Sequence, residues 1–164
     1  MSAQTTYKHS SPIGSPGGIV DLTPHAIDTF LNGEDTGAMK FGVGVVRGAT
    51  PGTNVALPTD SSTAAVFEGI TVNNRTTEYD VEGKAHLRKG KAIGVLRYGR
   101  IYVRVAAGAT PTYGAAAYLV KSGDEAGYFT TSSEDTIAIK GRFLGTIDST
   151  AQVAAVELYN TPNS

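Results

Sequence analysis

The sequence predicts a mainly β fold: an antiparallel sandwich or small barrel, jelly-roll-like, with an extended N-terminal arm. The 164 residues include 20 glycines and 7 prolines but only 2 methionines, and this composition favours short strands and turns over packed helices. Apolar runs recur about every eight to fifteen residues, with turn signals between them and no helical period. We expect one β domain over residues 39–160, an arm over residues 1–38 and a tail over residues 161–164.

The predicted arm differs in composition from the rest of the chain. Ser10–Gly18 carries proline and glycine too often for a helix or a central strand. Thr23 and Pro24 then form a helix-start pair, so we expect at most one helix of two turns. Its apolar stripe would be Ala26, Ile27, Phe30 and Leu31. Because fixing a backbone residue costs roughly 1–2 kcal/mol, we expect the arm to be disordered in the free protein and ordered on a partner.

The centre of the predicted domain is Ala92–Val105, where two runs of β-branched and aromatic residues flank Gly99. Ile93 and Val95 occupy alternate positions before the glycine, and aliphatic residues occupy alternate positions after it. Alternate residues of a strand point to the same face, so each half can bury one face. We expect a β-hairpin that turns at Gly99. A second hairpin is predicted from residues 115–120 to 128–131, and further strands at 41–46, 55–57, 67–72, 137–139, 143–147 and 153–158.

The sequence shows no constellation of catalytic or metal-ligating residues. Adjacent carboxylates on a strand point to opposite faces, which makes them poor acid–base pairs. The adjacent pairs are Glu34–Asp35, Asp124–Glu125 and Glu134–Asp135. The three histidines are far apart, at His9, His25 and His86, and the chain has no cysteine and no Gly-x-Ser-x-Gly motif. We therefore predict a protein that is not an enzyme and has no metal site or cofactor, and the sequence leaves open only a Ca²⁺ ion bound at one of these acidic loops.

The charge balance also limits which classes of partner we expect. Fourteen basic and fifteen acidic residues give a formal net charge of -1, which provides no broad attraction to nucleic acid. No stretch approaches the roughly 20 apolar residues of a membrane span, and the N-terminus lacks a signal-peptide pattern. We expect no nucleic-acid partner, no membrane association and synthesis in a cytoplasm. The dense basic stretch Lys84–Lys91 is either a contact for phosphate or an acidic surface, or a solvated strand edge.

Several glycine and aliphatic phrases together resemble the structural cement (capsid decoration) proteins of tailed bacteriophages. They are Met39–Arg47, Leu57–Thr59, Phe67–Ile70, Gly90–Val105, Tyr113–Tyr118 and Leu144–Ile147. The resemblance covers most of residues 38–158. It implies a small β-rich domain on the outer surface of a phage head, made in the host cytoplasm. Such a domain would self-associate, as a homodimer or homotrimer, and tie neighbouring major capsid subunits together.

Partner contacts are predicted in the arm and the basic stretch, because an arm can lay an extra strand on a neighbour without a deep pocket. The candidate residues are Tyr7, Ile13, Ile19, Val20, Leu22, Phe30, Leu31, Arg88, Lys89 and Lys91. The alternative is a β-sandwich binding module for glycan or host-surface attachment on the virion, favoured by eight tyrosines and the loop Thr110–Tyr113. Nothing in the sequence supports a third class, a small hydrolase.

Overall fold

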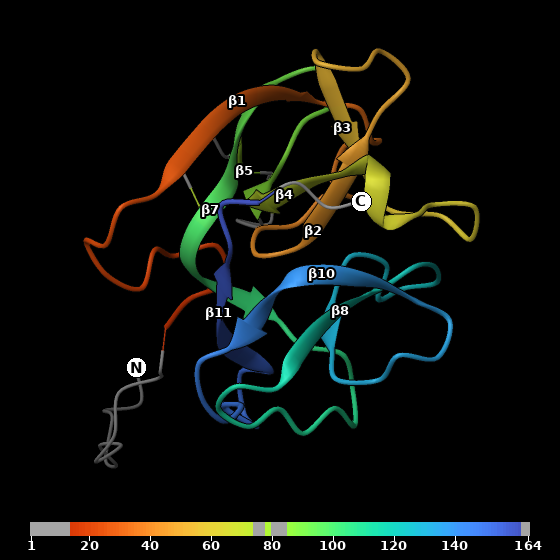
Figure 1. The fold of residues 1–164 in the computed structure, drawn as a ribbon. Helices are drawn as coiled ribbons and strands as arrows, with labels where there is room; N and C mark the ends of the chain where they lie inside the picture. The colour runs from red at the N-terminus through yellow and green to blue at the C-terminus, as the bar shows by residue number, and fades with distance from the viewer. Residues whose placement is uncertain (1–13, 74–77, 80–84, 162–164) are drawn as a thin grey trace, which may run out of the picture.

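The computed structural model describes residues 14–73, 78–79 and 85–161. In this part the chain forms strands and one short 3-10 turn, η1 (Ala64–Val66), and no α-helix (Figure 1). The strands are β1 (Ala26–Asn32), β2 (Gly44–Arg47), β3 (Asn54–Ala56), β4 (Phe67–Thr71), β5 (Glu78–Tyr79), β6 (Ala85–His86), β7 (Ala92–Arg104), β8 (Ala116–Val120), β9 (Phe129–Thr130), β10 (Thr136–Phe143) and β11 (Val153–Leu158). The predicted mainly β class is confirmed.

Five strands close into a barrel because β1 pairs at both of its edges. It is parallel to β3 at Leu31–Asn54 and antiparallel to β7 from Ala26–Tyr98 to Leu31–Ala92. Antiparallel pairs of β3 with β2, β2 with β4 and β4 with β7 complete the circle. Alternating apolar residues of these strands fill the interior. The core residues are Phe30, Met39, Val43, Val45, Val55, Leu87, Ile93 and Val95.

The remaining strands of the sheet form a second lobe, the lower half of Figure 1, from β7 through β11, β10 and β8 to β9. A bridge between Val105 and Phe129 joins β9 back to the chain just after β7. The predicted hairpin at 115–131 is confirmed, since β8 pairs with β9 in antiparallel fashion. The predicted strand at 143–147 is not a separate element, because β10 ends at Phe143.

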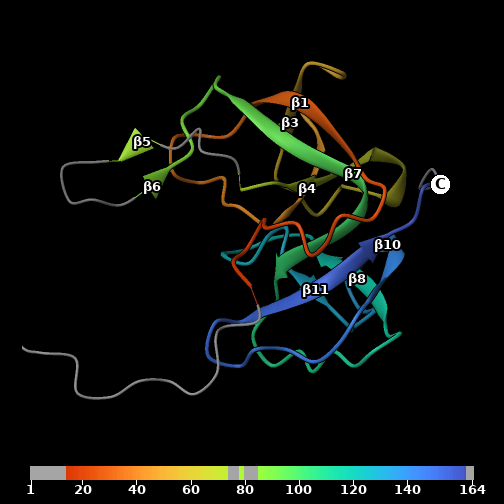
Figure 2. The ribbon, with the colours of Figure 1, turned by 90° about the vertical axis from the view of Figure 1, so that its left-hand side faces the viewer.

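β7 belongs to both lobes, and it runs from one to the other in Figure 2. It pairs with β1 and β4 before Gly99 and with β11 from Gly99 onward. Gly99 has a φ of 119°, and a Cβ there would lie 2.5 Å from Cβ of His25. Only glycine fits where the strand bends. The predicted hairpin at Gly99 is therefore wrong, because each half of the stretch pairs with other strands.

The predicted helix in the arm is also wrong. Phe30 and Asn32 of β1 are buried while Ile27 and Leu31 are exposed, as expected for a strand on a barrel. A two-turn helix has little stability of its own, whereas β1 gains ladder hydrogen bonds on both edges. Residues 17–20 and β1 thus lie along β7 of the same chain. The expectation that the arm becomes ordered only on a partner stays a prediction. Residues 1–13 lie outside the described residues.

Candidate partner-binding surface

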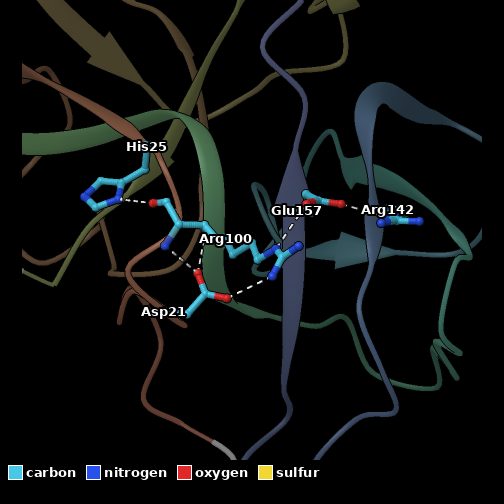
Figure 3. Close-up of polar contacts among 6 residues, drawn as sticks. Asp21, His25, Arg100, Arg142 and Glu157 are labelled. Atoms are coloured by element: carbon cyan, nitrogen blue, oxygen red, sulfur yellow. Dashed lines mark hydrogen bonds and ion pairs between the residues drawn. The ribbon is translucent and has the colours of Figure 1, made fainter.

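Four charged side chains from four segments form a chain across one face of the molecule (Figure 3). Arg100 of β7 donates from Nη1 to Asp21 Oδ2 at 2.9 Å and from Nε to Glu157 Oε1 at 3.0 Å. Arg142 of β10 donates from Nε to Glu157 Oε2 at 2.9 Å. We call Asp21, Arg100, Glu157 and Arg142 the charge clasp. It ties the segment before β1 to β7, β11 and β10.

The charge clasp favours the charged form of each of its members. Hydrogen bonds from Thr23, and then from Arg100, hold the pKa of Asp21 below its ordinary value. Burial acts to raise the pKa of Glu157, but the hydrogen bonds from Arg100 and Arg142 together outweigh it and lower that pKa. The carboxylates in turn raise the pKa values of both arginines, through the hydrogen bonds of Asp21 with Arg100 and of Glu157 with Arg142.

Backbone contacts hold the same segment against β7. The N–H of Gly17 donates to the carbonyl of Tyr102 at 2.7 Å, and the N–H of Tyr102 donates to the carbonyl of Gly18 at 2.9 Å. The N–H of Val20 donates to the carbonyl of Arg100 at 3.1 Å. Residues 17–20 therefore lie beside β7 like a short extra strand, and the charge clasp fixes the residue that follows them.

The next residues, Asp21–His25, form a tight turn, which we call the exposed turn. The backbone N–H of Thr23 donates to Asp21 Oδ1 at 3.0 Å, and its hydroxyl donates to the same oxygen. His25 Nδ1 donates to the carbonyl of Thr23 at 2.8 Å. Side-chain hydrogen bonds of this kind stabilise turns. The turn carries Leu22, which is 98% exposed.

An open groove of about 320 Å³ runs beside the exposed turn. Thr23 and Pro24 line one side of it, and residues 98–100 of β7 and 157–160 around the end of β11 line the rest. Tyr159, which is 44% exposed, lies in this lining. Because the groove is open to solvent and has charged and aromatic walls, it is suited to a protein surface.

The predicted basic stretch lies at the other end of β1. Arg88, Lys89 and Lys91 are exposed between β6 and β7. Lys89 Nζ lies 2.9 Å from Asp35 Oδ1, and this hydrogen bond lowers the pKa of Asp35 and raises that of Lys89. The N–H of Asn32, the last residue of β1, donates to the carbonyl of Lys91 at 2.9 Å. The structure therefore does not bring the basic stretch to the exposed turn, which precedes β1.

The predicted contact residues of the arm have different positions. Ile19 and Val20 are half-buried beside β7, while Leu22 and Leu31 are exposed. The prediction that Phe30 contacts a partner is corrected, because Phe30 lies in the barrel core and is not available to a partner. Tyr7 and Ile13 fall outside the described residues.

The sequence interpretation missed the charge clasp. Its members come from four segments that only the pairing of the strands brings together. One local signal was present, because Asp21 two residues before Thr23 is a pattern that forms side-chain-stabilised turns. It predicts the exposed turn but not the arginine that holds it.

The described residues were also searched for metal-binding clusters and for membrane-spanning helices. Across residues 14–73, 78–79 and 85–161, no three side chains among His, Cys, Asp and Glu gather to hold a metal ion. Within the same ranges, no helix is long and apolar enough to cross a membrane.

Comparison with known proteins gives this surface a context. The family model described as structural cement protein (E217 gp24/Pam3 gp6) matches residues 3–159. The chain belongs to the structural cement protein family. No curated protein matches the sequence. A chain from the solved structure titled "The capsid of Myoviridae Phage XM1" has the same fold, with a TM-score of 0.73 and 19% identity over 98% of this chain and 99% of that chain.

Membership of this family gives the cement protein a structural role in a phage capsid. Its place is the capsid of the virion, and its association is with that capsid. The role matches the surface described above, which offers contact area and a fixed projecting turn. It also agrees with the prediction of a structural protein.

Proposed function

We propose that this cement protein binds the outer surface of the phage head and bridges neighbouring major capsid subunits, so that the shell resists disruption. The observation that carries the proposal is family membership over residues 3–159, joined to a fold whose described part presents an exposed turn and an open groove. A bridge of this kind works by adding contacts at many equivalent boundaries, so each copy needs only modest affinity.

The two-lobed shape supports bridging. β7 runs through both lobes and links them by one continuous strand. A body of this kind can contact one subunit with each lobe and resist their separation, because strain on one lobe passes along the shared strand. Self-association as a homodimer or homotrimer would extend the same effect across more boundaries of the lattice.

The test uses heads that lack the cement protein and the purified full-length chain. We expect stoichiometric binding, a higher temperature of head disruption, and density at boundaries between neighbouring subunits in a map of the decorated head. Sedimentation of the free protein measures its oligomeric state. Failure to bind would end the proposal, and density centred over single subunits would contradict bridging while leaving binding intact.

Glycan attachment is a second candidate, favoured by one observation. Tyr113 is 68% exposed, and the Arg142 guanidinium lies 5.5 Å from its ring centroid. Exposed aromatic rings are surfaces on which sugars can stack. A glycan array probed with the free protein tests this candidate. A cement protein that has no glycan-attachment function would bind none of the glycans.

A further inference from the structure

Asn32, the last residue of β1, is followed by Gly33, and this is the one Asn–Gly pair in the sequence. Asparagine is a labile residue, because the backbone nitrogen of the next residue can lose its proton and attack the side-chain Cγ. The bond from Cγ to the amide nitrogen then breaks, ammonia leaves, and water opens the cyclic succinimide to aspartate or isoaspartate. Glycine has no side chain to obstruct this attack. Asn32–Gly33 therefore carries the pattern that favours deamidation.

The fold holds both reacting groups in hydrogen bonds. The attacking nitrogen of Gly33 donates its proton to the carbonyl of Val55 at 2.9 Å. The amide of Asn32 donates from Nδ2 to the carbonyl of Leu87 at 3.1 Å and accepts at Oδ1 from the N–H of Glu34 at 3.0 Å. Deamidation must break the bonds of the attacking nitrogen and of the leaving amide, and it must admit water to a residue that is 1% exposed.

The same hydrogen bonds close the barrel. β1 meets β3 at two register pairs, those of Leu31 and Asn32, and the bond from Gly33 to Val55 continues this pairing. We call these contacts the seam. The backbone of Asn32 also bonds residues 90–91, at 2.7 and 2.9 Å. A short pairing at the end of a strand opens more readily than the middle of a long ladder. Opening of the seam therefore exposes the labile pair without unfolding the second lobe.

Either product of deamidation would prevent the seam from closing again. Aspartate has an oxygen in place of the Nδ2 donor, so a carboxylate would face the carbonyl of Leu87 at a buried position. A buried charge without its hydrogen-bond partners is costly. Isoaspartate adds a methylene group to the backbone and shifts the following residues out of register with β3. Damage at this one pair of residues thus opens the barrel permanently.

We propose that Asn32–Gly33 is a latent modification site, at which the closed barrel suppresses deamidation and opening of the seam starts it. Each opening that ends in modification removes one molecule from the folded population, so the reaction makes a reversible opening irreversible. This inference concerns the chain itself and does not rest on the proposed function.

The experiment follows the amide of Asn32 in the full-length chain by mass spectrometry after tryptic digestion. Trypsin cuts after Lys8 and Lys40, and Asn32 is the one asparagine in the peptide 9–40, which contains no glutamine. In mildly alkaline buffer, we expect conversion to be at least about a hundredfold slower in the folded protein than in urea, because the reaction needs the open seam. The peptide 48–75 is the internal control, since none of its three asparagines precedes a glycine. It should convert slowly in both conditions.

Two matched valine substitutions separate opening of the seam from unfolding of the whole chain. Val55 belongs to the barrel core and Val156 to the core of the second lobe, and both are 0% exposed. Val55→Ala should accelerate deamidation of Asn32 in native buffer about tenfold, and Val156→Ala should stay within about twofold. Unfolding curves confirm that both variants fold. In the wild type, the amide of Gly33 should exchange slowly with solvent, a measurement that needs no variant.

A second pair of variants tests the effect of the product. Asn32→Asp reproduces the aspartate form, and Asn160→Asp makes the same change at an exposed position. We expect the unfolding midpoint of Asn32→Asp to lie well below that of the wild type, and that of Asn160→Asp to match it.

Each contrary outcome overturns one part of the proposal. Absence of conversion at Asn32 in urea overturns the site itself, and equal rates in urea and in native buffer overturn the suppression by the fold. Equal acceleration by Val55→Ala and Val156→Ala overturns the seam as the place of opening, because the reaction then follows unfolding of the whole chain. An Asn32→Asp variant as stable as the wild type overturns the claim that damage prevents closure.

Discussion

Arg100 and Asp21 form an ion pair across 79 residues of sequence, with Nη1 lying 2.9 Å from Oδ2. The same guanidinium bonds Glu157. One side chain of β7 thus holds the segment before β1 and the strand β11 together.

Replacement of Arg100 by glutamine should loosen residues 17–21 while leaving the barrel and the second lobe folded. Glutamine carries no charge and has no planar fork that can serve two carboxylates. Hydrogen exchange should therefore become faster in residues 17–21. Arg97→Gln is the control, since Arg97 lies on the same strand but pairs with Glu68 and Asp28. Equal effects of both variants would show that the clasp does not hold this segment.

The contribution of Asp21 to stability should depend on pH in the acid range. Its pKa is lowered in the fold, so its stabilising effect is fully present above the ordinary aspartate pKa of about 4. The effect is lost as the pH falls through the lowered value, where the folded carboxylate takes up its proton. The difference in Tm between wild type and Asp21→Asn should therefore shrink from pH 7 towards pH 2. A difference that is independent of pH would contradict the role of the ion pair.

Gly69 should tolerate no side chain. Its φ is 151°, and an added Cβ would lie 2.2 Å from the carbonyl oxygen of Leu96 on the neighbouring strand. Gly69→Ala must displace backbone inside the barrel, and we expect a loss of roughly 3 kcal/mol or more in the free energy of unfolding. Gly52→Ala is the matched control: its φ is also positive, at 79°, but nothing lies within 4 Å. It should cost about 1 kcal/mol, as measured by denaturant titration.

Asn32 should contribute to the stability of the fold although its side chain is polar. It is 1% exposed, its Nδ2 donates to the carbonyl of Leu87 at 3.1 Å, and its Oδ1 accepts from the N–H of Glu34 at 3.0 Å. Asn32→Ala leaves both partners unsatisfied at the closing edge of the barrel, which should cost about 2–3 kcal/mol. Asn160→Ala, at an exposed position, should stay within about 0.5 kcal/mol. Similar small losses for both would mean that water replaces the amide of Asn32.

Much of the strand pattern could be predicted from the sequence, because alternation and turn residues act over a few neighbours. The hairpin of β8 and β9 illustrates this, since its partners adjoin along the chain. Ala26–Asn32 illustrates the limit. Its apolar spacing fits both a short helix and a strand, and the pairing with β7 and β3 decides between them.

The sequence by itself determined a mainly β, cysteine-free chain without a catalytic constellation, along with the cement-family phrases. Only the tertiary structure decided that Ala92–Arg104 is one bent strand and that Asp21, Arg100, Glu157 and Arg142 meet. The physical reason is that strand alternation depends on adjacent residues, whereas strand partners and ion pairs depend on which distant segments can close the two lobes without clashes. Gly99 allows the bend between them, and the choice of partners places Leu22 on a fixed turn in solvent.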